Sequence, residues 1–305
     1  MQLTEPVAAV DCGTNTVRLL VGALPDIAVR ESRIVRLGQG VDATGRLSEE
    51  ALARTFAAMD DYAATIREHG VTRVRVCATS AVRDAANGDV FVRGVEERFG
   101  VGPDILTGEE EAGLAFDGAV RNLTGPAPAP VLVVDIGGGS TELVLGSGDG
   151  TVDAAHSMDI GSVRLTERHL HRDPPTADEV AACVADIETH LDEAPVPVGD
   201  ARTVVGVAGS TLTIAAGVLE LTSYDHAAID QARLAATDVA AFVERLVAMR
   251  VDERRALPYM NPGRADVIGA GGLILARVLA RAHVATMVAS ESDILDGIAW
   301  SLVHP

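Results

Sequence analysis

The chain has 305 residues, of which 48% are hydrophobic and 23% charged, and its formal net charge is −19 at pH 7. At roughly 100–200 residues per domain, this length predicts two domains with sizeable cores and excludes a mainly disordered chain. The acidic excess argues against nucleic acid or a membrane surface as a partner, and the lack of an apolar run of about 18 residues argues against a membrane span, so we expect a cytoplasmic protein.

An internal repeat organises the sequence. The stretch "VAAVDCGTNTVRLLVG" at 7–22 aligns without gaps on "VLVVDIGGGSTELVLG" at 131–146, with Asp11 on Asp135. Each copy is an apolar run, a tight turn and a second apolar run. This pattern is typical of a β-hairpin, whereas a Rossmann or P-loop glycine motif would open a helix after its strand. The repeat therefore predicts a duplicated α/β domain.

Helix and strand patterns alternate after the first copy. Ser48 is placed to cap a helix whose apolar residues recur with the helical period until Gly70. Residues 71–82 read as a strand, and 109–123 as a helix. The three prolines of "TGPAPAP" at 124–130 interrupt the periodicity, so we expect a hinge there.

The second half continues the alternation. Thr176 and Glu179 form a capping-box pattern at the start of a helix, and 203–217 runs from a buried strand into a helix. Two further helices, a short strand and a last helix follow, at 238–250, 264–282, 285–290 and 293–303. We expect a first domain over 1–124, joined by the C-terminal helix 293–305, and a second domain over 125–292.

The three cysteines, Cys12, Cys77 and Cys183, lie in apolar surroundings and lack the spacing of metal ligands. The sequence therefore predicts buried thiols and no disulfide framework.

The two hairpins carry the first candidate site residues. Asp11 and Asp135 each precede a tight turn whose free amides suit phosphate oxygens, and the first of these turns holds Thr14 and Asn15. Both carboxylates are expected to bind Mg²⁺, or Mn²⁺ in its place, because hard cations prefer oxygen ligands. Glu142 lies on the second arm of its hairpin and folds back toward Asp135, unless it is simply an exposed strand residue.

The residue aligned with Glu142 in the first copy is Arg18. This asymmetry places the expected metal nearer to the second hairpin.

Three glutamates at 109–111 sit where a helix is expected to start. Acids there complement the helix dipole, which accounts for at least two of them. A functional interpretation needs one glutamate to act as the general base for an attacking water, and the spacing does not choose between the two.

Other candidates are cations and a second helix start. Arg83 follows a predicted strand, where its planar fork is suited to two phosphate oxygens or to a salt bridge; Arg36 and Arg164 are weaker candidates of this kind. Gly209 and Ser210 precede a helical pattern, which favours either an anion or a simple N-cap.

Taken together, these motifs resemble those of the exopolyphosphatase and guanosine pentaphosphate phosphatase family, within the actin, sugar kinase and Hsp70 superfamily. The resemblance covers nearly the whole chain and includes "AVDCGTNTVRLLVG", "ATSAVRDAANG", "TGEEEAGLAFDGA", "VVDIGGGSTELVLG", "GVAGSTLT" and "RADVIGAGGLIL". It implies an α/β fold with two ribonuclease H-like (actin-like) domains and a cleft between them. A homodimer is also expected on this basis.

The resemblance also assigns roles to residues. It implies that Glu111 is the catalytic base, that Asp135 and Glu142 are metal and phosphate-site carboxylates, and that Arg83 binds phosphate. The implied phosphate contacts of the second turn are Gly137, Gly138, Gly139 and Ser140.

The implied reaction is hydrolysis of the terminal phosphoanhydride of inorganic polyphosphate. Alternatives are a guanosine pentaphosphate 5′-phosphatase of the stringent response, a kinase of the same superfamily, and a non-catalytic regulator that binds polyphosphate or a nucleotide. Longer family members carry extra C-terminal domains, so we expect distributive action or a preference for shorter polyphosphate. The acidic residues Glu291 and Asp293 near the end receive no role.

Overall fold

Both predicted hairpins form in the computed structural model, which describes residues 5–303. The four strands are β1 (Val7–Cys12), β2 (Thr16–Ala23), β6 (Val131–Ile136) and β7 (Thr141–Gly146). In the first hairpin Asp11 lies opposite Arg18, and in the second Asp135 lies opposite Glu142. The gapless repeat is therefore confirmed residue by residue in the pairing of the strands.

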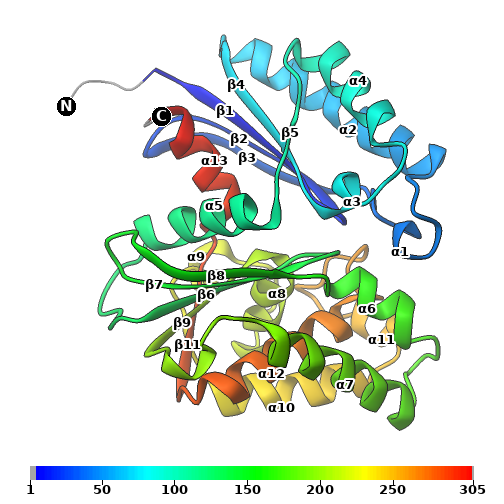
Figure 1. Cartoon of the computed structure of the whole chain (residues 1–305), viewed down its shortest axis with the longest axis vertical. Coiled ribbons are helices and arrows are strands. Elements are labelled where there is room, and N and C mark those ends of the chain that lie inside the picture. The colour runs from blue at the N-terminus through cyan, green and yellow to red at the C-terminus, as the bar shows by residue number, and fades with distance from the viewer. Residues whose placement is uncertain (1–4, 304–305) are drawn as a thin grey trace. The chain divides into compact units, whose positions relative to one another are not determined.

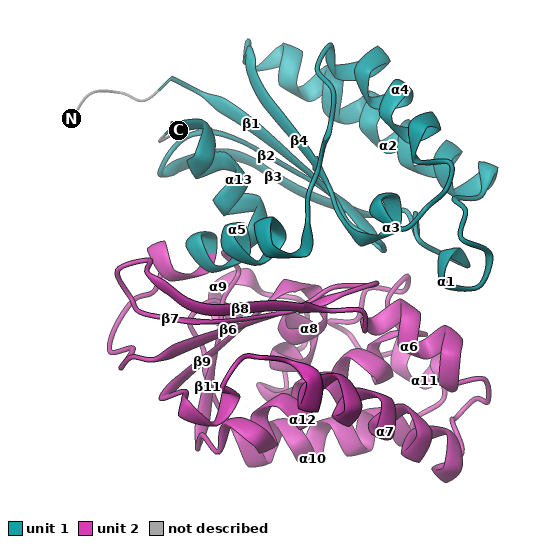
Figure 2. Ribbon diagram, in the orientation of Figure 1, with its two compact units in different colours: residues 1–118, 294–305 teal, residues 119–293 magenta. Residues whose placement is uncertain are grey.

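The chain divides into two units, coloured separately in Figure 2. Unit 1 comprises Met1–Gly118 and Ile294–Pro305, and unit 2 comprises Ala119–Asp293. Unit 1 is thus discontinuous in sequence, because its last helix comes from the end of the chain. Unit 2 is a single uninterrupted stretch.

The described part of unit 1 contains a five-stranded sheet in the order β3-β2-β1-β4-β5 (Figure 1). The further strands are β3 (Asp26–Ile34), β4 (Arg73–Ala78) and β5 (Asp104–Ile105). Its helices are α1 (Val41–Thr44), α2 (Glu49–Glu68), α3 (Ser80–Arg83), α4 (Gly88–Phe99), α5 (Gly108–Arg121) and α13 (Ile294–Val303). β1, β4 and β5 are parallel, so their carboxyl ends meet at one edge.

Alternation along β1 gives unit 1 two cores. Ala8 and Val10 point to the face that α2 and α4 cover, where Met59 and Phe91 are fully buried. The residues between them, such as Ala9, pack on the other face against α5 and α13. Since side chains alternate with a period of two, Asp11 belongs to the face of α5 and α13.

The described part of unit 2 contains a six-stranded sheet in the order β10-β11-β9-β6-β7-β8. The further strands are β8 (Val152–Met158), β9 (Thr203–Val207), β10 (Arg233–Ala235) and β11 (Thr286–Ala289). Here too an antiparallel hairpin continues into parallel strands, since β6, β9 and β11 run in the same direction.

The helices of unit 2 gather over one face of its sheet (Figure 1). They are α6 (Ser162–His169), α7 (Ala177–Glu193), α8 (Ala208–Val218), α9 (His226–Ile229), α10 (Ala236–Ala248), α11 (Val251–Arg255) and α12 (Ile268–Ala282). Leu132, Val134 and Ile136 of β6 lie in the core that these helices close. The two sheets confirm the predicted α/β class with two actin-like domains, while a cleft between them stays a prediction.

Local signals were accurate where the side chains themselves fix a helix start. The Ser48 hydroxyl accepts from the Ala51 amide at the start of α2, and Thr176 and Glu179 form the predicted capping box of α7. The three cysteine thiols are buried, as predicted. Within residues 5–303, none of the helices is long and apolar enough to cross a membrane.

Candidate active site

The turn of the first hairpin directs its carbonyls into its own unit. The Gly13 amide donates to the Thr16 carbonyl at 2.9 Å, and the Gly38 amide donates to the Thr14 carbonyl at 2.8 Å. The Asn15 carbonyl accepts from the amides of Val35 and Arg36, each at 2.9 Å. The carbonyl oxygens of Thr14, Asn15 and Thr16 are thus satisfied within unit 1. An edge of successive N–H groups favours anions in general.

The glycine turn of the second hairpin is held in the same way by α6. The Gly137 amide donates to the Ser140 carbonyl at 3.0 Å. The Ser162 amide donates to the Gly137 carbonyl at 2.9 Å, and the Val163 and Arg164 amides donate to the Gly138 carbonyl at 2.9 and 3.1 Å. The first turn of α6 thus satisfies the carbonyls of Gly137 and Gly138.

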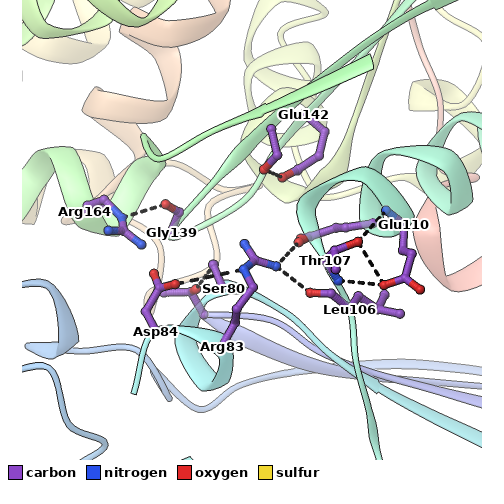
Figure 3. A network of polar contacts seen from close by, with 12 residues as sticks. Ser80, Arg83, Asp84, Leu106, Thr107, Glu110, Gly139, Glu142 and Arg164 are labelled. Atoms are coloured by element: carbon purple, nitrogen blue, oxygen red, sulfur yellow. Dashed lines mark hydrogen bonds and ion pairs between the residues drawn. The ribbon is translucent and has the colours of Figure 1, made fainter. Parts of the chain in front are cut away.

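Two side-chain features tighten this contact. Arg164 Nε donates to the Gly139 carbonyl at 2.7 Å, so this weak candidate holds the turn (Figure 3). A Cβ on Gly161 would lie 2.5 Å from the carbonyl carbon and oxygen of Gly138, closer than real Cβ contacts allow. Only glycine at 161 lets α6 approach the turn this closely.

The second hairpin carries two buried carboxylates. Asp135 is 6% exposed and Glu142 1% exposed, so the alternative of an exposed strand residue for Glu142 is wrong. Opposite positions of an antiparallel pair place side chains on the same face, with Cβ atoms about 4.5–5.5 Å apart. Ser157 Oγ donates to Glu142 Oε1 at 2.7 Å.

This pair fits a hard divalent cation. Among the described residues no group of three or more His, Cys, Asp or Glu side chains is placed to hold a metal. Mg²⁺ does not need one, because it commonly uses one or two carboxylates together with water and substrate phosphates.

The first hairpin differs at the same position. Arg18 donates to Asp11 Oδ2 through Nε at 2.9 Å and through Nη2 at 2.6 Å. Both side chains are largely buried, with 4% of the Asp11 side chain and 16% of the Arg18 side chain exposed. This carboxylate therefore lies in a charge-neutral pair.

Arg83 and Glu111 are brought together in unit 1. Arg83 ends the short helix α3, and not a strand as the sequence predicts. Its Nη1 donates to the Leu106 carbonyl at 2.7 Å (Figure 3). The same nitrogen donates to Glu111 Oε2 at 3.2 Å. The predicted phosphate-binding arginine thus contacts the predicted base.

Burial separates the three glutamates that spacing could not. Glu109 and Glu110 are exposed, while Glu111 is 7% exposed. Glu110 accepts from the Thr107 amide at 2.8 Å and from the Thr107 hydroxyl at 2.9 Å, and these bonds lower its pKa. Glu110 therefore acts at the start of α5, as the structural interpretation of the acids requires.

Glu111 has the opposite electrostatics. Burial raises its pKa to about 7, and the charge of Asp11 adds to the rise, against the opposing effects of Arg83 and the Thr79 hydroxyl. A carboxylate whose pKa lies near neutrality is suited to take and return a proton at physiological pH.

The start of α8 lies in unit 2. Its N-cap is Val207, without a side-chain cap, so Ser210 is not an N-cap; it lies in the first turn and is 4% exposed. A Cβ on Gly209 would lie 2.1 Å from Arg264 Nη2. Arg264 Nη1 donates to Thr213 Oγ1 at 2.9 Å, so its guanidinium lies over the first turn of the helix.

Arg264 is a candidate that sequence reasoning missed. It belongs to the motif "RADVIGAGGLIL", and its guanidinium fills the space that a Cβ at position 209 would need. No local pattern in the sequence indicates this contact. Arg36, the other weak candidate, has a positive φ of 54° and supports the first turn through its amide.

Comparison with known proteins places this arrangement in a family. Residues 17–304 match the Ppx/GppA phosphatase family. The chain is 49% identical to a protein named Exopolyphosphatase 2 from Mycobacterium tuberculosis, over 99% of both sequences. A crystal structure of an exopolyphosphatase-like protein has a TM-score of 0.95 at 42% identity, over 98% of this chain and 99% of that chain.

The crystal structure of the Aquifex aeolicus member of the Ppx/GppA family has a TM-score of 0.83 at 30% identity, over 98% of both chains. The chain therefore belongs to the Ppx/GppA phosphatase family.

Proposed function

We propose that the protein is an exopolyphosphatase, which hydrolyses the terminal phosphoanhydride bond of inorganic polyphosphate and releases phosphate. The observation that carries this proposal is the buried Glu111 carboxylate, with a pKa of about 7, in contact with the Arg83 guanidinium. The name of the 49% identical relative supports the same substrate.

The chain's own residues divide the work of the reaction. The oxygen of a water attacks the terminal phosphorus while the bond to the bridging oxygen breaks, and Glu111 takes the proton of the water. Arg83 binds the oxygens of the transferred phosphoryl group with its planar fork. The amides of Thr14 and Asn15, and those of Gly138, Gly139 and Ser140, hold further phosphate oxygens, as do Gly209 and Ser210 at the start of α8. The Gly137 amide does not take part, because it donates to the Ser140 carbonyl.

Asp135 and Glu142 are the residues that would hold Mg²⁺, or Mn²⁺. When bound, this cation supplies positive charge that offsets the charge of the phosphate chain. The two buried carboxylates on opposite strands support this assignment.

Guanosine pentaphosphate is the alternative substrate, because a Photobacterium profundum protein that is 34% identical over 58% of this chain and 36% of its own length is named guanosine-5'-triphosphate,3'-diphosphate pyrophosphatase. Removal of its 5′-terminal phosphate breaks the same kind of bond and needs no further catalytic group. The predicted homodimer and the cytoplasmic location stay part of the proposal.

The decisive experiment compares phosphate release from short polyphosphate, long polyphosphate and guanosine pentaphosphate in the presence of Mg²⁺. Glu111→Gln should lower kcat by about 100-fold or more, the usual contribution of a general base. Glu110→Gln is the matched control on the same helix turn and should retain turnover. The ranking of the three substrates names the activity, and no release from any of them would refute the hydrolase.

A further inference from the structure

The internal repeat allows one position to be compared between two copies of the same hairpin. Residue for residue, Asp11 corresponds to Asp135 and Arg18 corresponds to Glu142, and both pairs lie directly opposite each other on their strands. The two residue pairs therefore share their position on the hairpin and differ in their charge. The first pair sums to zero, and the second pair sums to −2 when both carboxylates are ionised.

The first pair has the features of a carboxylate bound to a cation. Both Nε and Nη2 of Arg18 donate to the same oxygen, Oδ2 of Asp11, at 2.9 and 2.6 Å. The pair is largely buried, with 4% of the Asp11 side chain exposed. A guanidinium remains charged at every physiological pH and is tied to the chain, so it cannot dissociate as a bound metal does.

The second pair places two carboxylates where the first has opposite charges. Both are at least nine-tenths buried, and two acids at facing positions repel unless positive charge or hydrogen bonds compensate them. Under the proposed function, a divalent cation provides that charge.

We propose that the guanidinium of Arg18 takes, in the first hairpin, the place that a divalent cation takes in the second. The chain then binds one divalent cation, at Asp135 and Glu142, and Arg18 is a positioning residue that fixes the Asp11 carboxylate. Asp11, expected from the sequence to be a metal ligand, is on this proposal the partner of a built-in positive charge. The inference rests on the proposed function only for the metal at the second hairpin.

The test converts one hairpin into the other and counts bound Mn²⁺ per chain by electron paramagnetic resonance. The wild type should bind one Mn²⁺. Arg18→Glu recreates the Asp–Glu pair of the second hairpin and should bind two. Arg18→Met, the matched control, removes the charge without adding a ligand and should bind one.

A wild type that binds two Mn²⁺, or none at millimolar concentration, would overturn the proposal, as would a folded Arg18→Glu variant that still binds one. If Arg18→Glu does not fold, the double variant D11N/R18Q decides, because a neutral amide pair keeps the hydrogen bonding. It should bind Mn²⁺ with a Kd within about threefold of the wild type, whereas loss of a true ligand costs about tenfold or more.

Phosphate release is measured on the same samples, so that the two proposals fail separately. A wild type that binds one Mn²⁺ but releases no phosphate would refute the exopolyphosphatase and leave the role of Arg18 standing. A wild type that releases phosphate but binds two Mn²⁺ would refute the role of Arg18 and leave the exopolyphosphatase standing.

Discussion

The proton affinity of a single residue, Glu111, sets the expected pH dependence of turnover. Its pKa is raised to about 7, mainly by burial. A general base works only when ionised, so kcat/KM for phosphate release should fall about tenfold per pH unit below that value. A pH profile from about pH 5 to about pH 9 measures this limb. An acid limb near the ordinary glutamate range would show that another group accepts the proton.

The same residue links stability to pH. Because the pKa of Glu111 is higher in the folded state than its ordinary value of 4.5, folding binds a proton between pH 4.5 and about 7, and stability falls as pH rises through that window. Glutamine mimics the protonated carboxyl. Glu111→Gln should therefore melt at a higher temperature than the wild type above pH 7, measured with EDTA, and the difference should shrink toward pH 5.

Glu110→Gln provides the control of opposite sign. The pKa of Glu110 is lowered by its bonds to Thr107, so its ionised form contributes stability at neutral pH that is lost as pH falls. This variant should melt lower than the wild type at neutral pH. A Glu111→Gln variant that also melts lower at pH 8 would show that the ion pair with Arg83 outweighs the cost of burial.

At the scale of elements, α6 contacts the glycine turn closely because residue 161 has no Cβ. Gly161→Ala places a methyl group 2.5 Å from the Gly138 carbonyl and must push α6 away from the turn. A displacement of about 1 Å at a phosphate site costs on the order of 100-fold in rate. Steady-state phosphate release measures the loss. Gly148→Ala, where a Cβ meets open space, should leave kcat within about twofold.

The end of α10 depends on a buried cation. Arg254 is 3% exposed and donates to the carbonyls of Leu246 and Val247 at 2.8 and 3.0 Å, in the last turn of the helix. Arg254→Met removes the donor to the buried Val247 carbonyl and leaves the Leu246 carbonyl with the Met249 amide alone, which should lower the free energy of unfolding by about 1–3 kcal/mol. Urea denaturation measures it. The exposed neighbour provides the control: a loss of similar size in Arg255→Met would contradict this account.

The elements that sequence reasoning recovered are those whose signals are local or repeated. The hairpins followed from a gapless alignment, and the starts of α2 and α7 from their caps. Helix α6 was missed, because its first amides bond to carbonyls of the glycine turn some 25 residues earlier. No periodicity within eight residues shows such a contact.

The residues of the candidate site could likewise be predicted where the signal is local or repeated, and not where it depends on contacts between distant segments. The repeat placed Glu142 opposite Asp135, but the choice of Glu111 over Glu110 depended on which side of α5 meets the sheet. Arg264 lies over α8 from a segment about 50 residues away. The tail residue Glu291 accepts bonds from Tyr224 and His226 at 3.0 and 2.9 Å, and these partners lie more than 60 residues earlier, where no local pattern indicates them.

For the whole molecule, the net charge of −19 opposes a polyanionic substrate. Salt screens repulsion over distances beyond about 8–10 Å but hardly affects contacts inside a site. At saturating Mg²⁺, the KM for long polyphosphate should therefore fall as NaCl rises from ~10 to ~150 mM, by about threefold. Guanosine pentaphosphate, with fewer charges, should respond less. Tightest binding at low salt without metal would contradict this expectation.

The discontinuity of unit 1 has a consequence for the newborn chain. Val7, Ala9 and Leu20 are buried in a core that Ile294 and other residues of α13 complete. A ribosome synthesises about 5–20 residues per second, starting from the N-terminus. This face of the sheet therefore stays uncovered until nearly the whole chain has been synthesised. Unit 2, which is uninterrupted, has its core complete earlier. The order of folding is thus expected to run against the order of synthesis.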